Sequence, residues 1–424
     1  MDQFRFIHAA DIHLDSPLRS LALRDPGLAG LIGNATRRAF TRIIDIALSE
    51  RVDAVLIAGD LYDGDQTSMK TARFLAEELR RLDAAGIATF IIRGNHDAMS
   101  RITRELVLPP SVKVFGGRAE AIALERGPGR FPVVIHGLSF AQPQVPESLV
   151  GRYRPAVEGA ANIGLLHTSL GGAPGHDVYA PSSVAELSAT GFSYWALGHI
   201  HQRAVAATGT STVVMAGMPQ GRDINEAGPK SVTLASIGAD RTVRLEERLT
   251  SVAEFQRVSL DVSGITEWRD LPEAIGRVLE GRRAMVRSPH LVARLALTGT
   301  TPLAWRIRRD LDLLKAEADE RAAVVGSASV EKLEAACHAP GESIAVPGDP
   351  LGELSRLMAQ EILPSDAFKG EMARIADELR KQLPPECRDI LGADADASGA
   401  LLDALAREGT ENVLARLRAG EGAA

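Results

Sequence analysis

The sequence has few cysteines, no apolar run long enough to span a membrane and no signal peptide. Its two cysteines, Cys337 and Cys387, lie far apart without CxxC spacing, which argues against a disulfide framework and a zinc ribbon. The apolar segment at residues 4–7 is too short for a signal peptide, and Asp2 before it is acidic. We therefore expect a cytoplasmic protein without a membrane-spanning segment.

The charge balance gives no direct sign of nucleic-acid binding. The chain has a formal charge of −7 at pH 7, and no arginine-rich run or basic stretch interleaved with aromatic residues is present. The acidic excess lies in residues 300–424, whereas residues 1–299 are close to neutral. A near-neutral region becomes locally positive when it binds divalent cations, so the acidic balance does not exclude a polyanionic substrate.

The length and residue patterns predict three parts. A chain of 424 residues, 45% hydrophobic and 24% charged, is typical of a globular protein with one large domain and smaller ones. Residues 1–250 form the expected catalytic domain, residues 251–300 read as a small β-α-β module, and residues 301–424 read as helices joined by linkers, including one at 394–399.

The front of the chain alternates buried strands with amphipathic helices. An apolar run at residues 52–58 ends in Gly59-Asp60, which is typical of a buried parallel strand that delivers a carboxylate to the edge of a sheet. Short strands after residue 110 predict a second sheet packed on the first. The expected strands and helices of the first sheet are strands 4–10, 52–58 and 87–92 and helices 34–50 and 68–84.

Polar side chains of the metal-binding type follow one strand after another. Because ligands bind at the carboxyl ends of strands in open α/β sheets, we expect these side chains to converge around Asp60. Mixed carboxylate and imidazole ligation suits Mn²⁺, Fe²⁺ or Zn²⁺ better than Mg²⁺ or Ca²⁺. The residues are Asp11, His13, Asp60, Asn95, His96, His167, His199 and His201.

The ordered motifs DxH, GDxxD, GNHD, a single histidine and GHxH resemble the calcineurin-like metallophosphoesterase superfamily. This resemblance implies an α/β fold, a four-layer α/β/β/α sandwich of two mixed sheets, with a small α+β cap and a C-terminal helical region. The opening at residues 11–17 and the block at 217–222, followed by Glu226, resemble bacterial SbcD-like nuclease subunits of the YhaO-like DNA repair exonuclease branch.

The resemblance also implies two divalent metal ions, with Mn²⁺ as the expected metal. The first ion would be held by Asp11, His13, Asp60 and His201. Asp60 would bridge to the second ion, which would also be held by Asn95, His167 and His199.

The remaining motif residues have expected roles in catalysis and substrate binding. His96 would donate a proton to the leaving oxygen or stabilise its charge, and Asp97 would orient His96. Asp63 would support the site. Arg203 and Arg222 follow the motifs, and their guanidinium groups are candidates for phosphate contacts.

The resemblance implies a DNA exonuclease that hydrolyses phosphodiesters from 3′ ends in DNA repair. It also implies a homodimer and a complex with a coiled-coil ATPase of the SbcC or Rad50 kind, for which the C-terminal helices are the expected docking site. The alternatives are a phosphoesterase of the same fold acting on small phosphodiesters or phosphoproteins, and a catalytically silent scaffold. The helical region can also be read as a self-contained domain.

Overall fold

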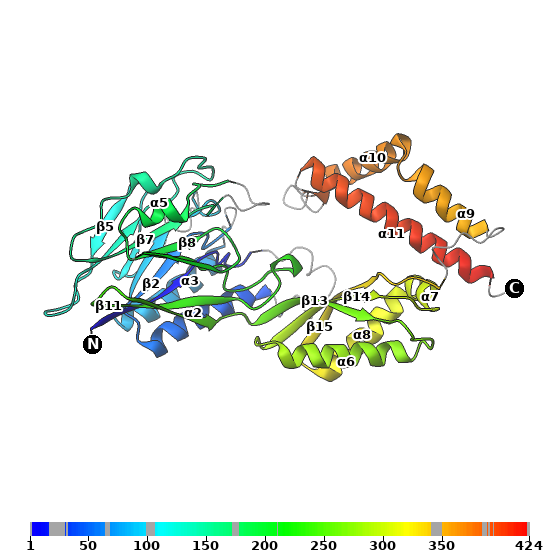
Figure 1. Ribbon diagram of the computed structural model, residues 1–424, viewed down its shortest axis with the longest axis horizontal. Helices are drawn as coiled ribbons and strands as arrows, with labels where there is room; N and C mark the ends of the chain where they lie inside the picture. The colour runs from blue at the N-terminus through cyan, green and yellow to red at the C-terminus, as the bar shows by residue number, and fades with distance from the viewer. Residues whose placement is uncertain are drawn as a thin grey trace. The chain divides into compact units, whose positions relative to one another are not determined.

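The computed structural model describes residues 2–16, 30, 33–63, 68–98, 107–171, 178–209, 211–340, 350–383, 388, 391–392 and 394–421. These residues divide into two compact units (Figure 1). The first consists mainly of Asp25–Phe255, and the second mainly of Gln256–Met285 and Leu291–Ala424. Cys337 is a buried thiol, and Cys387 lies outside the described residues.

The first unit contains two six-stranded sheets, of which one has the order β12-β11-β1-β2-β3-β4. The strands from β1 to β4 pair in parallel, whereas β11 and β12 run antiparallel to their neighbours, so the sheet is mixed. The strands are β1 (Gln3–Ala9), β2 (Ala54–Ala58), β3 (Ala88–Ile92), β4 (Val112–Val114), β11 (Ser231–Gly238) and β12 (Val243–Leu249).

The other six-stranded sheet has the order β5-β6-β7-β8-β10-β9. Its four central strands are parallel, and the two edge strands are antiparallel to them. The strands are β5 (Glu120–Ala123), β6 (Val133–Gly137), β7 (Ala161–His167), β8 (Tyr194–Gly198), β9 (Ala204–Thr208) and β10 (Ser211–Met215).

Alternating side chains of β2 separate two layers of core. Val55 and Ile57 pack against Phe40 of a covering helix, whereas Leu56 faces the other sheet and packs in one core with Ile163. Each such aliphatic side chain, when fully buried, contributes roughly 1.5–3 kcal/mol to stability. The covering helices are α2 (Ala35–Glu50) and α3 (Met69–Ala84).

The outer face of the second sheet packs under the short helix α5 (Val184–Ser188). Trp195 is fully buried there, and its Nε1 donates a hydrogen bond to the Leu187 carbonyl at 3.0 Å. Figure 1 shows the resulting layers in order, from α2 through the two sheets to α5. The expected four-layer α/β fold is therefore confirmed.

The second unit is built on a three-stranded sheet with the order β13-β14-β15. Its elements are β13 (Ala253–Asp261), α6 (Asp270–Met285), β14 (His290–Thr298), α7 (Ala304–Arg309), α8 (Leu311–Val325) and β15 (Ala328–Ala335). The expectation that residues 301–424 are helical is wrong for β15. This strand pairs in parallel with β14 after a crossover through α7 and α8, and it buries Val330 and Leu333.

The remaining elements are α9 (Pro350–Leu357), the π-helical turn η3 (Met358–Ile362), α10 (Asp366–Gln382) and α11 (Ala395–Glu421). The linker expected at 394–399 is wrong, because α11 already begins at Ala395. The Asp394 carboxylate accepts a hydrogen bond from the Ala397 amide at 2.8 Å, which satisfies a backbone donor of the first turn. Among the described residues, none of the helices combines the length and apolarity needed to cross a bilayer.

Candidate metal centre

The candidate site lies just beyond the carboxyl ends of parallel strands from both sheets. Asp11 follows β1 and Asp60 follows β2, while His167 is the last residue of β7. Backbone hydrogen bonds join the first two loops, from the Asp11 amide to the Gly59 carbonyl at 3.1 Å and from the His13 amide to the Asp60 carbonyl at 3.0 Å. The strand order therefore brings these distant polar residues together.

The backbone is strained at four of the candidate residues. Asp11, His13, Asp60 and His199 have φ angles of 51°, 44°, 51° and 104°. Residues with side chains rarely adopt such conformations, which cost about 1–3 kcal/mol each and cluster at functional sites. The sharp turns after the strands point these side chains towards one another. The surrounding fold stabilises these strained backbone conformations.

The first cluster contains Asp11, His13 and His201, whose ligand-type atoms lie within 4.8 Å of one another. His13 Nδ1 lies 2.7 Å from Asp63, and His201 Nδ1 lies 2.9 Å from Glu226. Ionised carboxylates only accept hydrogen bonds, so each Nδ1 carries the proton, and the two Nε2 atoms face each other as acceptors at 3.2 Å. Two facing lone pairs repel unless a cation lies beside them.

The surroundings as a whole favour the neutral, metal-binding form of His13 but not of His201. His13 is fully buried, and this burial lowers the pKa of its imidazole, although the hydrogen bond to Asp63 opposes the effect. Burial also lowers the pKa of His201, but the Glu226 carboxylate more than compensates, so the pKa of His201 is raised in the absence of a metal. Either histidine binds a metal only in the neutral form.

The second cluster contains Asp11, Asp60 and His167. His167 Nδ1 must donate to the Ala58 carbonyl, 2.9 Å away, because a carbonyl only accepts. The Nε2 atom of His167 therefore faces two further acceptors, Asn95 Oδ1 at 3.0 Å and Asp60 Oδ2 at 3.3 Å. Burial lowers the pKa of His167, but the Asp60 carboxylate outweighs burial and raises that pKa to about 9, so a proton fills this position when no metal is bound. In the neutral ring Nε2 would be a third acceptor beside the two oxygens, an arrangement that fits a cation.

Asp60 joins the two clusters. Its Oδ2 lies 3.3 Å from His167 Nε2 and 3.9 Å from His13 Nε2, and its Oδ1 accepts a hydrogen bond from the His96 amide at 3.0 Å. Burial raises the pKa of Asp60, but the positive field of His167 and the other histidines outweighs burial and holds that pKa well below its usual range. Asp60 therefore remains an anion close to the histidines of both clusters, and Asp11 belongs to both clusters.

The residues present fit a pair of divalent cations. Asp11, His13 and His167 have no exposed surface, and buried carboxylates are unfavourable unless they are paired with positive charge. The donor atoms are carboxylate oxygens, neutral imidazole nitrogens and one amide oxygen, a mixed set that suits transition metals such as Mn²⁺.

His199 contacts the site through its backbone. Its amide donates to both carboxylate oxygens of Asp11, at 2.9 and 3.1 Å, and its ring lies 5.2 Å from the His167 ring. A third cluster of ligand-type atoms contains His13, Asp63 and His96, and His199 belongs to none of the three among the described residues, so its assignment as a metal ligand stays a prediction.

The structure corrects the expected partner of His96. Asp97 is buried and accepts hydrogen bonds from the Gly94 amide at 2.7 Å and the Leu61 amide at 3.0 Å, so it fixes the backbone of two loops. Burial and the nearby Asp60 raise the pKa of Asp97 to about 7. The carboxylate beside His96 is Asp63, whose Oδ1 lies 3.4 Å from His96 Nδ1.

Two carboxylates outside the first cluster lie beside its histidines. One is Asp63, whose Oδ1 lies 2.7 Å from His13 Nδ1, and its supporting role stays a prediction. The supporting role of Glu226 was missed, because the sequence places this residue far from His201 in the chain. Arg222 Nη2 donates to Glu226 at 2.7 Å, so the charge of this arginine is compensated within the protein.

We predict that Gly94→Ala weakens metal binding roughly 10–100-fold, the range expected when ligand orientation is disturbed. An added Cβ would lie 2.3 Å from Asp60 Oδ1 and 2.6 Å from His167 Nε2, so both side chains must move. Isothermal titration with Mn²⁺ measures the effect. Gly151→Ala is the control, since nothing lies within 4 Å of its Cβ, and wild-type affinity in Gly94→Ala would contradict this geometry.

Removing the carboxylate that holds His201 should also weaken metal binding. We expect Glu226→Ala to reduce Mn²⁺ affinity roughly 10–100-fold, because the His201 ring loses its anchor and Arg222 loses its counter-charge. The same titration applies, with the exposed residue Glu158 replaced by alanine as the control. Equal affinities of the two variants would show that Glu226 does not position His201.

Two family models match the chain. The calcineurin-like phosphoesterase model matches residues 4–203, and the model of the middle domain of metallophosphoesterase YhaO matches residues 255–338, a range that includes β15. Among solved structures, a dimetal phosphatase from Danio rerio is similar over 59% of this chain and 97% of its own, at 13% identity and a TM-score of 0.39.

Curated proteins are similar over longer stretches. The uncharacterized metallophosphoesterase YhaO of Bacillus subtilis is 33% identical over 303 residues, which cover 70% of this chain and 72% of YhaO. The DNA double-strand break repair protein Mre11 of Sulfurisphaera tokodaii is 28% identical over 224 residues, which cover 52% of this chain and 54% of that protein. The chain thus belongs to the calcineurin-like metallophosphoesterase family and is homologous to YhaO and to the DNA double-strand break repair protein Mre11.

Proposed function

We propose that this metallophosphoesterase is a DNA exonuclease that uses two metal ions and removes nucleotides from 3′ ends during DNA repair. The observation that carries the proposal is the double cluster of buried acceptors joined by Asp60. The relatives named as DNA double-strand break repair proteins support DNA as the substrate.

The proposed ligands of the first ion are Asp11, His13, Asp60 and His201, and those of the second are Asp60, Asn95, His167 and His199. We expect Mn²⁺ in both positions. Two bound cations would neutralise the phosphoryl oxygens and lower the pKa of an attacking water.

The protein's own groups supply proton transfer and orientation. His96 has 46% of its side chain exposed, which leaves it accessible to a leaving oxygen, to which it would donate a proton. Asp63 Oδ1 lies 2.7 Å from His13 Nδ1 and 3.4 Å from His96 Nδ1, so it can position both rings. Asp97 would act indirectly, by fixing the loop that carries His96.

We also propose that the C-terminal helices dock a coiled-coil ATPase of the SbcC kind. Large apolar side chains are exposed on α10 and α11, including Ile375 at 50%, Leu379 at 47% and Leu405 at 46%. Such surfaces are typical of partner-binding helices. A full-length Ile375→Asp, Leu379→Asp variant should lose the ATPase in a pull-down, and unchanged capture would count against docking there.

The proposed domain division remains a nuclease domain at residues 1–250 and a small capping module at residues 251–300.

The direct test compares 3′-labelled double-stranded DNA with bis-p-nitrophenyl phosphate in the presence of Mn²⁺. Hydrolysis of both substrates, with labelled nucleotides released first, is the result expected for a 3′ exonuclease. Hydrolysis of the small ester alone would favour a phosphoesterase for small substrates or phosphoproteins. Hydrolysis of neither substrate by protein with bound metal would favour a scaffold.

A further inference from the structure

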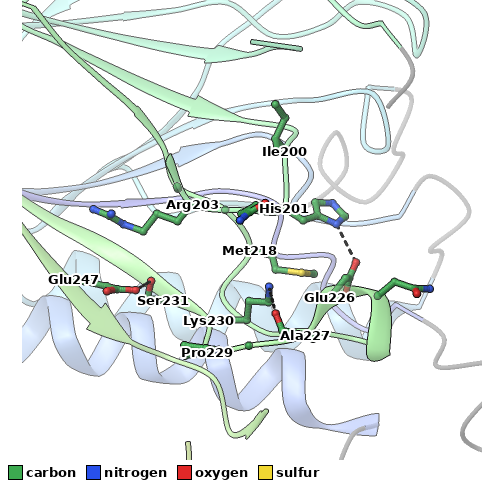
Figure 2. Close-up of a pocket in the computed structure, with 15 residues that line it drawn as sticks. Ile200, His201, Arg203, Met218, Glu226, Ala227, Pro229, Lys230, Ser231 and Glu247 are labelled. Carbon is green, nitrogen blue, oxygen red and sulfur yellow. Dashed lines mark hydrogen bonds and ion pairs between the residues drawn. The ribbon is translucent and has the colours of Figure 1, made fainter. Parts of the chain in front are cut away.

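A pocket of about 630 Å³ adjoins the candidate metal centre in the first unit. His201 and Glu226 line it, and so do Arg203 and Lys230. Figure 2 shows His201 and Glu226 on one side of the pocket, Arg203 extending away on the other, and Lys230 between them. The pocket therefore leads from a proposed metal ligand towards two basic side chains.

No ion pair joins Lys230 or Arg203 to a carboxylate among the described residues, although Glu226 and Glu254 act on Lys230 at longer range. Glu226 binds the Arg222 guanidinium at 2.7 Å and His201 at 2.9 Å, and Glu247 accepts a hydrogen bond from Ser231 at 2.6 Å. Lys230 Nζ donates to a neutral acceptor, the Ala227 carbonyl, at 3.2 Å. The positive charge of Lys230 is thus left without an anion in hydrogen-bond contact.

Arg203 has an unsatisfied donor. Its Nε is buried and has no hydrogen-bond partner among the described residues. Two groups that feel its charge, His8 and Tyr194, offer no negative charge, because burial lowers the pKa of His8 to about 3 and raises the pKa of the Tyr194 hydroxyl beyond the physiological range. Arg203 thus lines the pocket with no carboxylate bound to it among the described residues.

We propose that Arg203 and Lys230 bind the phosphodiester next to the scissile one on a nucleic-acid strand. The inference rests on the proposed nuclease function and deepens it, because it makes two successive phosphates the recognised unit. Guanidinium and ammonium groups are the usual partners of backbone phosphates. A phosphodiester carries one negative charge and acceptor oxygens, which match the positive charges of Lys230 and Arg203.

Because of this subsite, the protein should prefer a nucleic-acid strand over a small ester as a substrate. An ester with a single phosphate can occupy the metal centre but leaves the pocket without an anion. A substrate with two phosphates places one at the metal centre and the other beside Arg203 and Lys230, so it should bind more tightly. We expect the preference to be about tenfold, as for one charge-assisted hydrogen bond, and to appear mainly in KM.

The test uses the full-length protein with Mn²⁺ and two thymidine oligonucleotides, TpT with one phosphodiester and TpTpT with two. For wild-type protein, kcat/KM should be about tenfold higher for TpTpT, and Arg203→Gln and Lys230→Gln should each reduce that ratio towards one. The control is Arg118→Gln, an exposed arginine outside the pocket, which should keep the wild-type ratio.

The outcomes distinguish failure of the proposed nuclease function from failure of the subsite. If wild-type protein with bound metal hydrolyses neither oligonucleotide, the proposed nuclease function fails. If wild-type protein hydrolyses both oligonucleotides with similar kcat/KM, the nuclease function stands and the subsite is wrong. The same holds if both pocket variants keep the wild-type ratio of kcat/KM. Hydrolysis of TpT by each variant shows that it has folded.

Discussion

Replacing Asp60 by asparagine is expected to lower phosphodiesterase activity by about a thousandfold, because Lewis-acid stabilisation contributes several kcal/mol. The Asp60 carboxylate lies between the two histidine groups, 3.3 Å from His167 and 3.9 Å from His13. Asparagine keeps the size of the side chain but removes its charge. We expect titration with Mn²⁺ to show fewer bound ions than in wild-type protein.

The matched control for this variant is Asp45→Asn. Asp45 lies on α2, and 54% of its side chain is exposed in a surface ion pair with Arg81. Such pairs contribute about 0–1 kcal/mol, so activity and Mn²⁺ binding should stay close to wild type. Full metal occupancy in Asp60→Asn would contradict the shared role assigned to this carboxylate.

Replacing His96 by alanine should lower kcat for DNA by roughly 10²–10⁴-fold, the usual contribution of a general acid. Mn²⁺ binding should persist, because the contact between His96 and Asp60 is made by the backbone amide, which alanine retains. Steady-state kinetics combined with titration separates the two properties.

The choice of substrate provides an internal control for His96. The leaving group p-nitrophenolate departs without protonation, so His96→Ala should affect bis-p-nitrophenyl phosphate much less than DNA. Equal losses on both substrates, or loss of bound Mn²⁺, would argue that His96 supports the metal centre and does not act as a proton donor.

The fold was predictable where local patterns are strong. The apolar run at 52–58 and the helix at 34–50 correspond to β2 and α2, since strand and helix periodicities are encoded in consecutive residues. The strand β15 was missed, because its sequence contains three charged residues and it depends on pairing with β14, which no local pattern encodes.

The candidate site was predictable as a set of residues but not in its contacts. Asp11, Asp60 and His167 converge as expected, because each follows or ends a parallel strand. Whether Asp63 or Asp97 lies beside His96 depends on loop conformations, such as the left-handed backbone of Asp60, that sequence spacing does not reveal. The contact between Glu226 and His201 likewise requires the folded chain.

The most direct test of the metal centre is anomalous scattering from a crystal grown with Mn²⁺. We predict two manganese peaks roughly 3.5–4 Å apart, the spacing of two-metal sites, with the Asp60 carboxylate between them. A single peak, or manganese bound away from Asp11, Asp60 and His167, would contradict the dinuclear site on which the proposed function depends.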